Sequence, residues 1–294
     1  MEYRIEHDSM GEVKVPKDRY WAAQTERSRN NFQIGMGQET MPREITHAFG
    51  ILKKAACLAN NTLKPEKMTS KKVKAITKAC DEVISGSLND HFPLVVWQTG
   101  SGTQSNMNAN EVIANRANEI AKEKLCHPND DINMSQSSND TFPTALHISS
   151  VLVLEDKVLP AIDILVNTFK RLEKENKGIV KSGRTHLQDA VPVSFSQEIS
   201  GWRTSLERDA EMIKSSLPYL KQLALGGTAV GTGLNAPKGF DKEVAKQVSE
   251  LTGKKFVTAP NKFHALTSKD ELVYAHGALK ALACDMMKIA NDVR

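Results

Sequence analysis

Three polar stretches of this sequence carry residue types that bind small anions. They run from Gly100 to Asn106 (GSGTQSN), from Ser135 to Asp140 (SQSSND) and from Gly183 to Gln188 (GRTHLQ), each just before a predicted helix start. A helix N-terminus offers free backbone N–H groups and the positive end of the helix dipole, and hydroxyl and amide side chains add further donors. Small carboxylates would therefore suit these stretches as ligands.

The same residue types are also the ones that helix caps and turns prefer. For any single stretch, an ordinary cap or turn is the simpler interpretation. The three stretches together with the glycine-rich run from Gly226 to Gly233 favour a binding site made of several loops. The glycine-rich run is not a phosphate-binding P-loop, because it lacks the Gly-Lys-Ser/Thr ending.

Two histidines are candidates for a chemical role. His186 follows Thr185 in the third stretch, and histidine can exchange protons near neutral pH. From its position alone, a structural histidine is the simpler interpretation. His127 precedes the run from Pro128 to Asp131, where either a turn with Asx hydrogen bonds or an auxiliary anion contact fits.

Long helices must position these stretches, because apolar residues recur at alternating spacings of three and four. The first seam predicts a helix over residues 141–176, kinked at Pro160, and the second a helix over residues 192–226, kinked at Pro218. The seams are Val158, Ile162, Leu165, Phe169 and Leu172; Phe195, Ile199, Trp202, Leu206 and Ile213; and Leu272, Ala275, Leu279, Leu282, Met286, Ile289 and Val293.

The third seam is introduced by Ser268 and Glu271, which form a capping-box pattern. It reaches Arg294 without a stop signal, so we expect the chain to be part of a longer protein. Shorter helices are predicted over residues 44–63, 65–84 and 109–125, and strands over 94–97 and 255–258. The predicted fold class is mainly α, with an amino-terminal helical domain over residues 1–139 and the first part of a long-helix bundle over 140–294.

The amino-acid composition limits the classes of function that are compatible with this sequence. Lys and Arg total 39 against 35 Asp and Glu, and the formal charge of +4 is spread along 294 residues, so nucleic acid is not an expected partner. No stretch approaches the ~18 apolar residues of a membrane span, and the polar amino terminus has no apolar signal core. The four cysteines form neither a C-x-x-C pair nor a zinc pattern. We expect a soluble, cytoplasmic protein with cysteines in its core and without a bound metal.

Six motifs in order give the sequence a resemblance to the fumarase/aspartase superfamily, and in detail to class II fumarase. They are DSMGE (8–12), DRYW (18–21), GSGTQSNMN (100–108), HPND (127–130), SQSSND (135–140) and GRTHLQDA (183–190). His186 and Ser101 are typical of fumarase rather than of aspartase, its nearest relative. Together the motifs span essentially the whole chain.

This resemblance implies a mostly helical chain whose long central helices form a tetrameric bundle, with each active site built from loops of three subunits. The implied reaction is the reversible hydration of fumarate to (S)-malate without a metal or organic cofactor. His186 would activate or receive the water. The residues implied to bind substrate are Ser101, Gly102, Thr103, Asn106, Ser137, Ser138, Asn139 and Thr185, and those of a second, peripheral dicarboxylate site are His127, Pro128, Asn129 and Asp130.

One expected motif is absent from the 294 residues. The Gly-Ser-Ser-x-Met-Pro-x-Lys-x-Asn loop of the family, which holds the serine assigned as the proton-abstracting base, does not occur here, nor does a carboxy-terminal domain. We therefore expect this chain by itself to be inactive or nearly so. Two alternatives remain open: an aspartate ammonia-lyase, and a non-catalytic helical scaffold that binds dicarboxylates.

Overall fold

The computed structural model describes residues 2–294, which divide into two compact units. Unit 1 comprises the chain up to Ser149 together with Lys221–Ser268, and unit 2 comprises Ser150–Leu220 together with Lys269–Arg294. Both units are thus discontinuous in sequence. Helices dominate both, and the mainly α fold class is confirmed.

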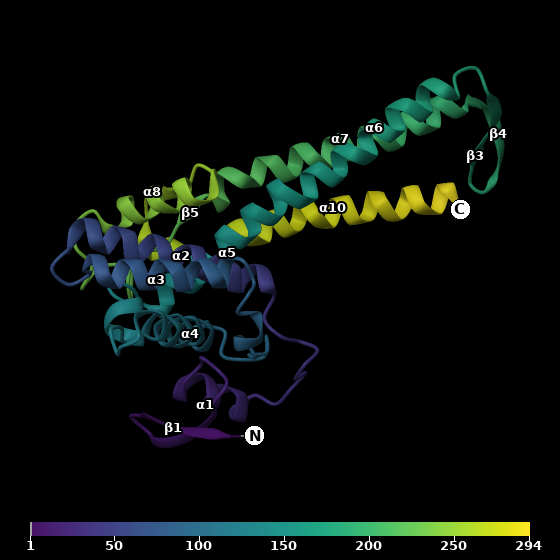
Figure 1. Cartoon of the computed structure of the whole chain (residues 1–294). Coiled ribbons are helices and arrows are strands. Elements are labelled where there is room, and N and C mark those ends of the chain that lie inside the picture. Colours follow the sequence, from purple (N-terminus) through teal and green to yellow (C-terminus); the bar gives the residue numbers. More distant parts are fainter. Residues whose placement is uncertain (1) are drawn as a thin grey trace. The chain divides into compact units, whose positions relative to one another are not determined.

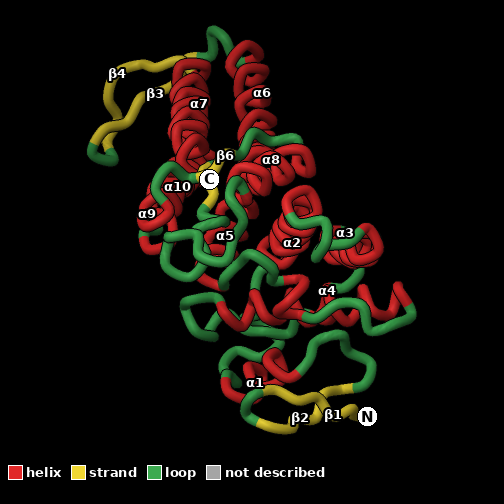
Figure 2. The backbone as a smooth tube through the Cα atoms, turned by 90° about the vertical axis from the view of Figure 1, so that its left-hand side faces the viewer, coloured by secondary structure: helices red, strands yellow, loops and turns green. Residues whose placement is uncertain are grey.

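Unit 1 is a set of packed helices with three short pairs of strands or bridges at its margins (Figures 1 and 2). β1 pairs antiparallel with β2, and β5 pairs parallel with β6. The elements are β1 (Tyr3–Asp8), β2 (Gly11–Pro16), α1 (Ala23–Asn31), α2 (Arg43–Leu63), α3 (Ser70–Ile84), η1 (Asn89–His91), α4 (Thr103–Ala121), η2 (Pro128–Ile132), α5 (Ser138–Val153, which continues into unit 2), β5 (Gln222–Leu223), α8 (Phe240–Thr252), β6 (Val257–Thr258) and α9 (Lys262–Thr267).

Helix α2 lies at the centre of unit 1, where it packs against α3, α4 and α8. Its buried stripe includes Phe49, Leu52 and Ala56 at helical spacing. Gly50 allows α3 to approach closely, since a Cβ there would lie 2.9 Å from Cγ1 of Ile84. The apolar contacts along this stripe form the main core of the unit.

A buried carboxylate joins α1 to α4. Glu111 of α4 is 3 % exposed, and its oxygens accept the backbone N–H groups of Ala22 (2.8 Å) and Gln24 (2.9 Å) and the hydroxyl of Thr25 (2.6 Å). These residues stand at the start of α1, where N–H groups have no partner within the helix. Burial raises the pKa of Glu111, and the hydrogen bonds oppose this. The carboxylate thus caps α1 from a neighbouring helix.

Unit 2 consists of three long helices and a β-hairpin. α7 packs against both α6 and α10, and the hairpin connects α6 to α7 (Figure 1). Its core includes Ile162, Leu206 and Ile213, and the rings of Phe169 and Trp202 lie 5.8 Å apart. The elements are η3 (Leu154–Val158), α6 (Leu159–Glu175), β3 (Val180–Thr185), β4 (Gln188–Ser194), α7 (Phe195–Leu220) and α10 (Asp270–Val293).

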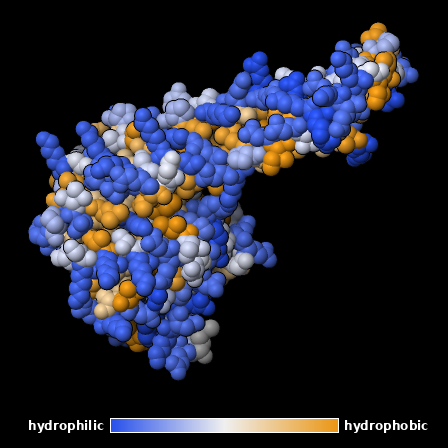
Figure 3. Space-filling model, turned by 45° about the horizontal axis from the view of Figure 1, so that its top comes forward, coloured by the Kyte–Doolittle hydropathy of each residue, from blue (hydrophilic) through white to orange (hydrophobic). Residues whose placement is uncertain are grey.

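Much apolar surface of unit 2 is exposed. Figure 3 shows apolar side chains along its helices and at the end that carries the hairpin. On α10 the exposed apolar residues include Val273, Met287 and Val293, and on the hairpin they include Leu187 and Val191. Among residues 2–294, no helix is long and apolar enough to cross a membrane.

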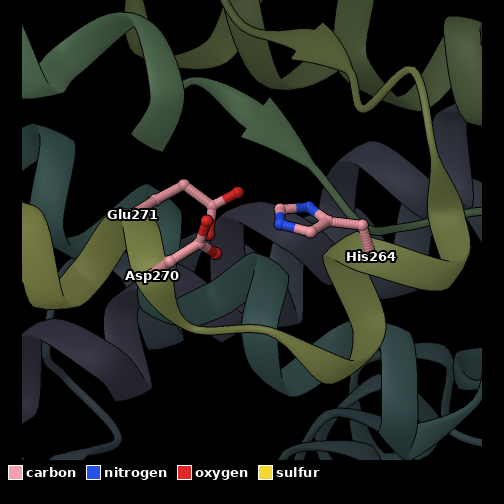
Figure 4. A group of neighbouring side chains, drawn as sticks. All are labelled: His264, Asp270 and Glu271. Atoms are coloured by element: carbon pink, nitrogen blue, oxygen red, sulfur yellow. The ribbon is translucent and has the colours of Figure 1, made fainter.

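The long predicted helices form with altered ends. The helix predicted over residues 141–176 is a continuous succession of α5, η3 and α6, with Pro160 in the first turn of α6. The predicted start at Pro192 is wrong, because this residue lies in β4 and α7 begins at Phe195. The capping box of Ser268 and Glu271 stays a prediction; α10 begins at Asp270, directly after Lys269, and Asp270 and Glu271 occupy its first turn (Figure 4).

The predictions for the shorter helices, for one strand and for the cysteines are correct only in part. The helix predicted over residues 44–63 matches α2, but the next begins only at Ser70, because Thr69 serves as the N-cap. The helix predicted over 109–125 is shifted, since α4 runs from Thr103 to Ala121. In place of a strand over 94–97, Val95 forms a single bridge with Thr40. Of the cysteines predicted in the core, Cys57, Cys80 and Cys126 are buried and Cys284 is exposed.

We predict that Glu111→Gln lowers the free energy of unfolding by about 1–2 kcal/mol, because an amide has one acceptor oxygen where the carboxylate uses two. Urea denaturation followed by circular dichroism measures the change. The matched control is Glu119→Gln on the same helix, where an exposed carboxylate pairs with Arg116 and the loss should stay below about 1 kcal/mol. Equal losses in the two variants would contradict the capping role of Glu111.

Candidate functional site

The first predicted stretch forms the N-terminus of α4. Gly102 is the N-cap, with a φ of 73° in the left-handed region. A Cβ at this position would overlap the ring of Phe142 in α5, so glycine is required by both its backbone and its surroundings. The hydroxyl oxygens of Ser101 and Thr103 lie 3.1 Å apart on either side, and both residues are exposed. The stretch therefore presents two hydroxyl groups at a helix start.

The second predicted stretch forms the N-terminus of α5, which begins at Ser138. Asp140 accepts the backbone N–H of Ser137 through Oδ1 at 2.9 Å, and the Ser137 hydroxyl accepts the backbone N–H of Asn139 at 3.2 Å. These bonds fix the turn that leads into the helix. Asn139 itself is exposed, and Ser137 and Ser138 are partly exposed.

One hydrogen bond joins the two stretches. Asn106 of α4 is fully buried, and its Nδ2 donates to Oγ of Ser138 at 3.1 Å. The starts of α4 and α5 therefore lie next to one another within unit 1. Two helix N-termini and several hydroxyl groups in one place form a site suited to anions. The structure thus brings together seven of the predicted positions: Ser101, Gly102, Thr103, Asn106, Ser137, Ser138 and Asn139.

The glycine-rich run belongs to the same group of loops. Oδ2 of Asp140 accepts the backbone N–H groups of Gly226 at 2.9 Å and Thr228 at 2.8 Å, and Nδ2 of Asn139 donates to the carbonyl oxygen of Ala229 at 2.8 Å. Asp140 is fully buried, and burial raises its pKa to about 6 against the effect of these bonds. Both oxygens accept backbone N–H groups, so this carboxylate holds loops together and is not available as a metal ligand.

A buried lysine that is not among the predicted site residues lies beside these loops. Lys53 of α2 is 1 % exposed, and its Nζ donates to Asn106 (2.7 Å), Gln136 (2.9 Å) and Asn133 (3.1 Å). Burial lowers its pKa to about 7, and the charge of Asp140 opposes this. The sequence contains a sign that Lys53 is buried, because this residue stands four positions after Phe49 on the apolar stripe of α2.

The predicted second site lies along a cleft of unit 1. His127 caps the turn that follows it, since its Nδ1 accepts the backbone N–H groups of Asn129 at 3.3 Å and Asp130 at 3.4 Å. The cleft has a volume of about 670 Å³, and its walls include Thr103, Lys124, His127, Pro128 and Asn129. Thr103 of the first stretch therefore borders the same cavity as His127, Pro128 and Asn129, whereas Asp130, the fourth predicted residue of the second site, lines a different pocket.

Thr185 and His186 belong to unit 2, where they stand at the tip of the β3–β4 hairpin. The position predicted for them, just before a helix, is wrong because the stretch is a hairpin whose strands pair Thr185 with Gln188. His186 and Leu187 form the two-residue turn with φ of 51° and 62°, which is the geometry that matches the strand twist. Both residues of the turn are exposed.

Comparison with known proteins places the chain in a family. Residues 11–294 match the sequence model of the family described as Lyase, and the chain belongs to this family. Within it, the chain is 62% identical to fumarate hydratase class II of Bacillus cereus and 58% identical to that of Campylobacter jejuni. In both comparisons, 100% of this chain aligns with 64% of the relative. The resemblance to class II fumarase is confirmed.

Solved structures of similar proteins have the same fold as this chain. The class II fumarase from Schistosoma mansoni superposes with a TM-score of 0.96 at 42% identity, covering 99% of this chain and 64% of that one. The fumarate lyase:delta crystallin from Brucella melitensis in native form gives a TM-score of 0.90 at 34% identity, covering 100% of this chain and 66% of that one. The chain thus has the fumarase/aspartase-like fold and spans about two thirds of the length of these proteins.

We predict that Gly102→Ala lowers the free energy of unfolding by about 1–3 kcal/mol, because alanine is strained at this φ and its Cβ meets Phe142. Thermal or urea unfolding measures the loss. Gly100→Ala is the matched control, since a Cβ there meets nothing within 4 Å, and its effect should stay within about 0.5 kcal/mol. If Gly102→Ala is as stable as the control, the close contact between the starts of α4 and α5 is not as described.

Proposed function

We propose that the protein to which this chain belongs is a fumarate hydratase, which reversibly hydrates fumarate to (S)-malate. The observation that carries the proposal is the bond from Asn106 to Ser138, because it sets two helix N-termini and their hydroxyl groups side by side. Such a group of donors suits a small carboxylate. The identities of 54–62% to proteins named fumarate hydratase class II support the choice of substrate.

The chemistry explains why donors dominate the proposed site. In the malate direction, a base removes the proton next to a carboxylate, and the resulting charge spreads into that carboxylate as an aci-form before water leaves. The catalytic demand is therefore stabilisation of added negative charge by donors already in place. Ser101, Thr103, Ser138 and Asn139 are exposed or partly exposed and have the groups to meet this demand.

Proton transfer falls to other residues in this proposal. His186, exposed at the tip of the hairpin, activates or receives the water, and Thr185 beside it binds substrate. The resemblance assigns proton abstraction to the serine of a Gly-Ser-Ser-x-Met-Pro-x-Lys-x-Asn loop, which the 294 residues do not contain. We propose no resident metal or organic cofactor for the reaction. The second site, formed by His127, Pro128, Asn129 and Asp130, binds a further dicarboxylate in this account.

The proposed assembly is a homotetramer whose helical bundle includes α6, α7 and α10. The exposed apolar residues of α10, such as Val273 and Met287, are of the kind that a subunit interface covers. In such an assembly, the hairpin that carries His186 completes a site with loops of other subunits. We further propose a cytoplasmic location and no nucleic-acid partner, consistent with the charge of +4 spread along the chain.

The direct test follows the absorbance of fumarate formed from (S)-malate. We expect no turnover from the 294-residue chain alone, and turnover when it is co-expressed with the carboxy-terminal third of the Bacillus cereus relative, which supplies the serine loop. Release of ammonia from aspartate by the same assembly would instead identify an aspartate ammonia-lyase. Absence of both reactions in a folded assembly would favour a dicarboxylate-binding scaffold.

Within the active assembly, we predict that His186→Asn lowers kcat by about 100-fold or more, because asparagine keeps hydrogen-bonding groups but cannot carry the proton. His264→Asn is the matched control, since this histidine lies on α9 outside the proposed site, and kcat should change less than threefold. Full activity of the His186 variant would remove this residue from the proposed mechanism.

A further inference from the structure

The buried ammonium group of Lys53 is bonded by side-chain amides. All three hydrogen bonds of its ammonium group end on side-chain amide oxygens, those of Asn106, Asn133 and Gln136. An ammonium group has three N–H bonds, so the three acceptors satisfy it in full. The bonded partners of Lys53 are therefore neutral amides rather than a carboxylate.

The lysine decides which way the side chain of Asn106 points. An amide has an acceptor end and a donor end of nearly equal size, and only the oxygen end can face an ammonium group. Since Oδ1 of Asn106 lies 2.7 Å from Nζ of Lys53, its Nδ2 must face the opposite way. There it donates to Oγ of Ser138 and to Oδ1 of Asn133, both at 3.1 Å.

This orientation sets the role of the Ser138 hydroxyl. A hydroxyl oxygen that accepts an N–H bond keeps its own proton for another partner. Each donor in the series from ammonium to amide to hydroxyl polarises the next, which strengthens the last O–H as a donor. Ser138 is partly exposed at the start of α5, so this proton is available to an anionic ligand.

We propose that Lys53 is a positioning residue of the dicarboxylate site, which fixes the amide of Asn106 so that the hydroxyl of Ser138 donates to a carboxylate of the substrate. Lys53 does not touch the substrate and acts only through Asn106 and Ser138. The inference rests on the proposed function, because the ligand is taken to be fumarate or malate.

The test uses the active assembly of this chain with the carboxy-terminal segment. Lys53→Met should raise KM for (S)-malate about tenfold while kcat changes less than threefold, because a bond present in both ground and transition states is lost. Lys54→Met is the matched control on the next residue of α2; its lysine pairs with Asp81, and its KM should stay within twofold of the parent. A KM for Lys53→Met that is also within twofold would overturn the proposal.

A double-mutant cycle separates positioning from general support of the core. If Lys53 acts through Ser138, Lys53→Met should add less than twofold to the KM of Ser138→Ala. A lysine that merely stabilises the fold would impose its full tenfold effect in both backgrounds, and this result would overturn the proposal.

A measurement on the unaltered chain covers the case in which Lys53→Met does not fold or the assembly shows no turnover. The side-chain amide signal of Asn106, assigned in the nitrogen–proton spectrum by comparison with Asn106→Asp, should shift when fumarate is added to the 294-residue chain. The shift should be lost in Ser138→Ala. An unmoved signal at saturating fumarate would overturn the positioning role, whereas failure of turnover with a clear shift would count against the proposed reaction alone.

Discussion

The ammonium group of Lys53 can stay inside unit 1 only while three amide oxygens remain around it. Removing a charged group from water costs several kcal/mol unless hydrogen bonds replace the lost hydration. The side chains that supply those bonds, Asn106, Asn133 and Gln136, come from α4 and from the segment that leads into α5. The hydrogen bonds that the ammonium group of Lys53 requires therefore hold in place both helix starts of the candidate site.

Asp140 holds backbone segments in place, as Lys53 holds side chains. Its two oxygens accept N–H groups from the start of α5 and from the glycine-rich run, so two segments that are distant in sequence are fixed relative to one another. Asp140 also contributes a negative charge that offsets part of the positive charge of Lys53. The exposed hydroxyl groups of Ser101 and Thr103 are thus held on a frame that buried hydrogen bonds keep in place.

Much of this could be predicted from the sequence, because some signals are local. Helical periodicity marked the long helices, and the residue types of the first two stretches marked the starts of α4 and α5. The prediction that a helix follows the third stretch at Pro192 is wrong. Proline suits the start of a helix and the end of an edge strand equally well, and only tertiary context decides between them. The role of Lys53 depends on three amide side chains that only the folded chain brings together. The sequence alone shows a lysine among the apolar residues of a predicted helix. The discontinuous units escaped prediction for the same reason.

We propose that the joined starts of α4 and α5 bind a dicarboxylate. A crystal structure of the assembly of this chain and the carboxy-terminal segment, grown with fumarate, tests it most directly. We expect a fumarate carboxylate within hydrogen-bond distance of the Ser138 hydroxyl and of Ser101 or Thr103, with Nδ2 of Asn106 still donating to Ser138. Fumarate bound elsewhere, with only water between these two helix starts, would contradict it.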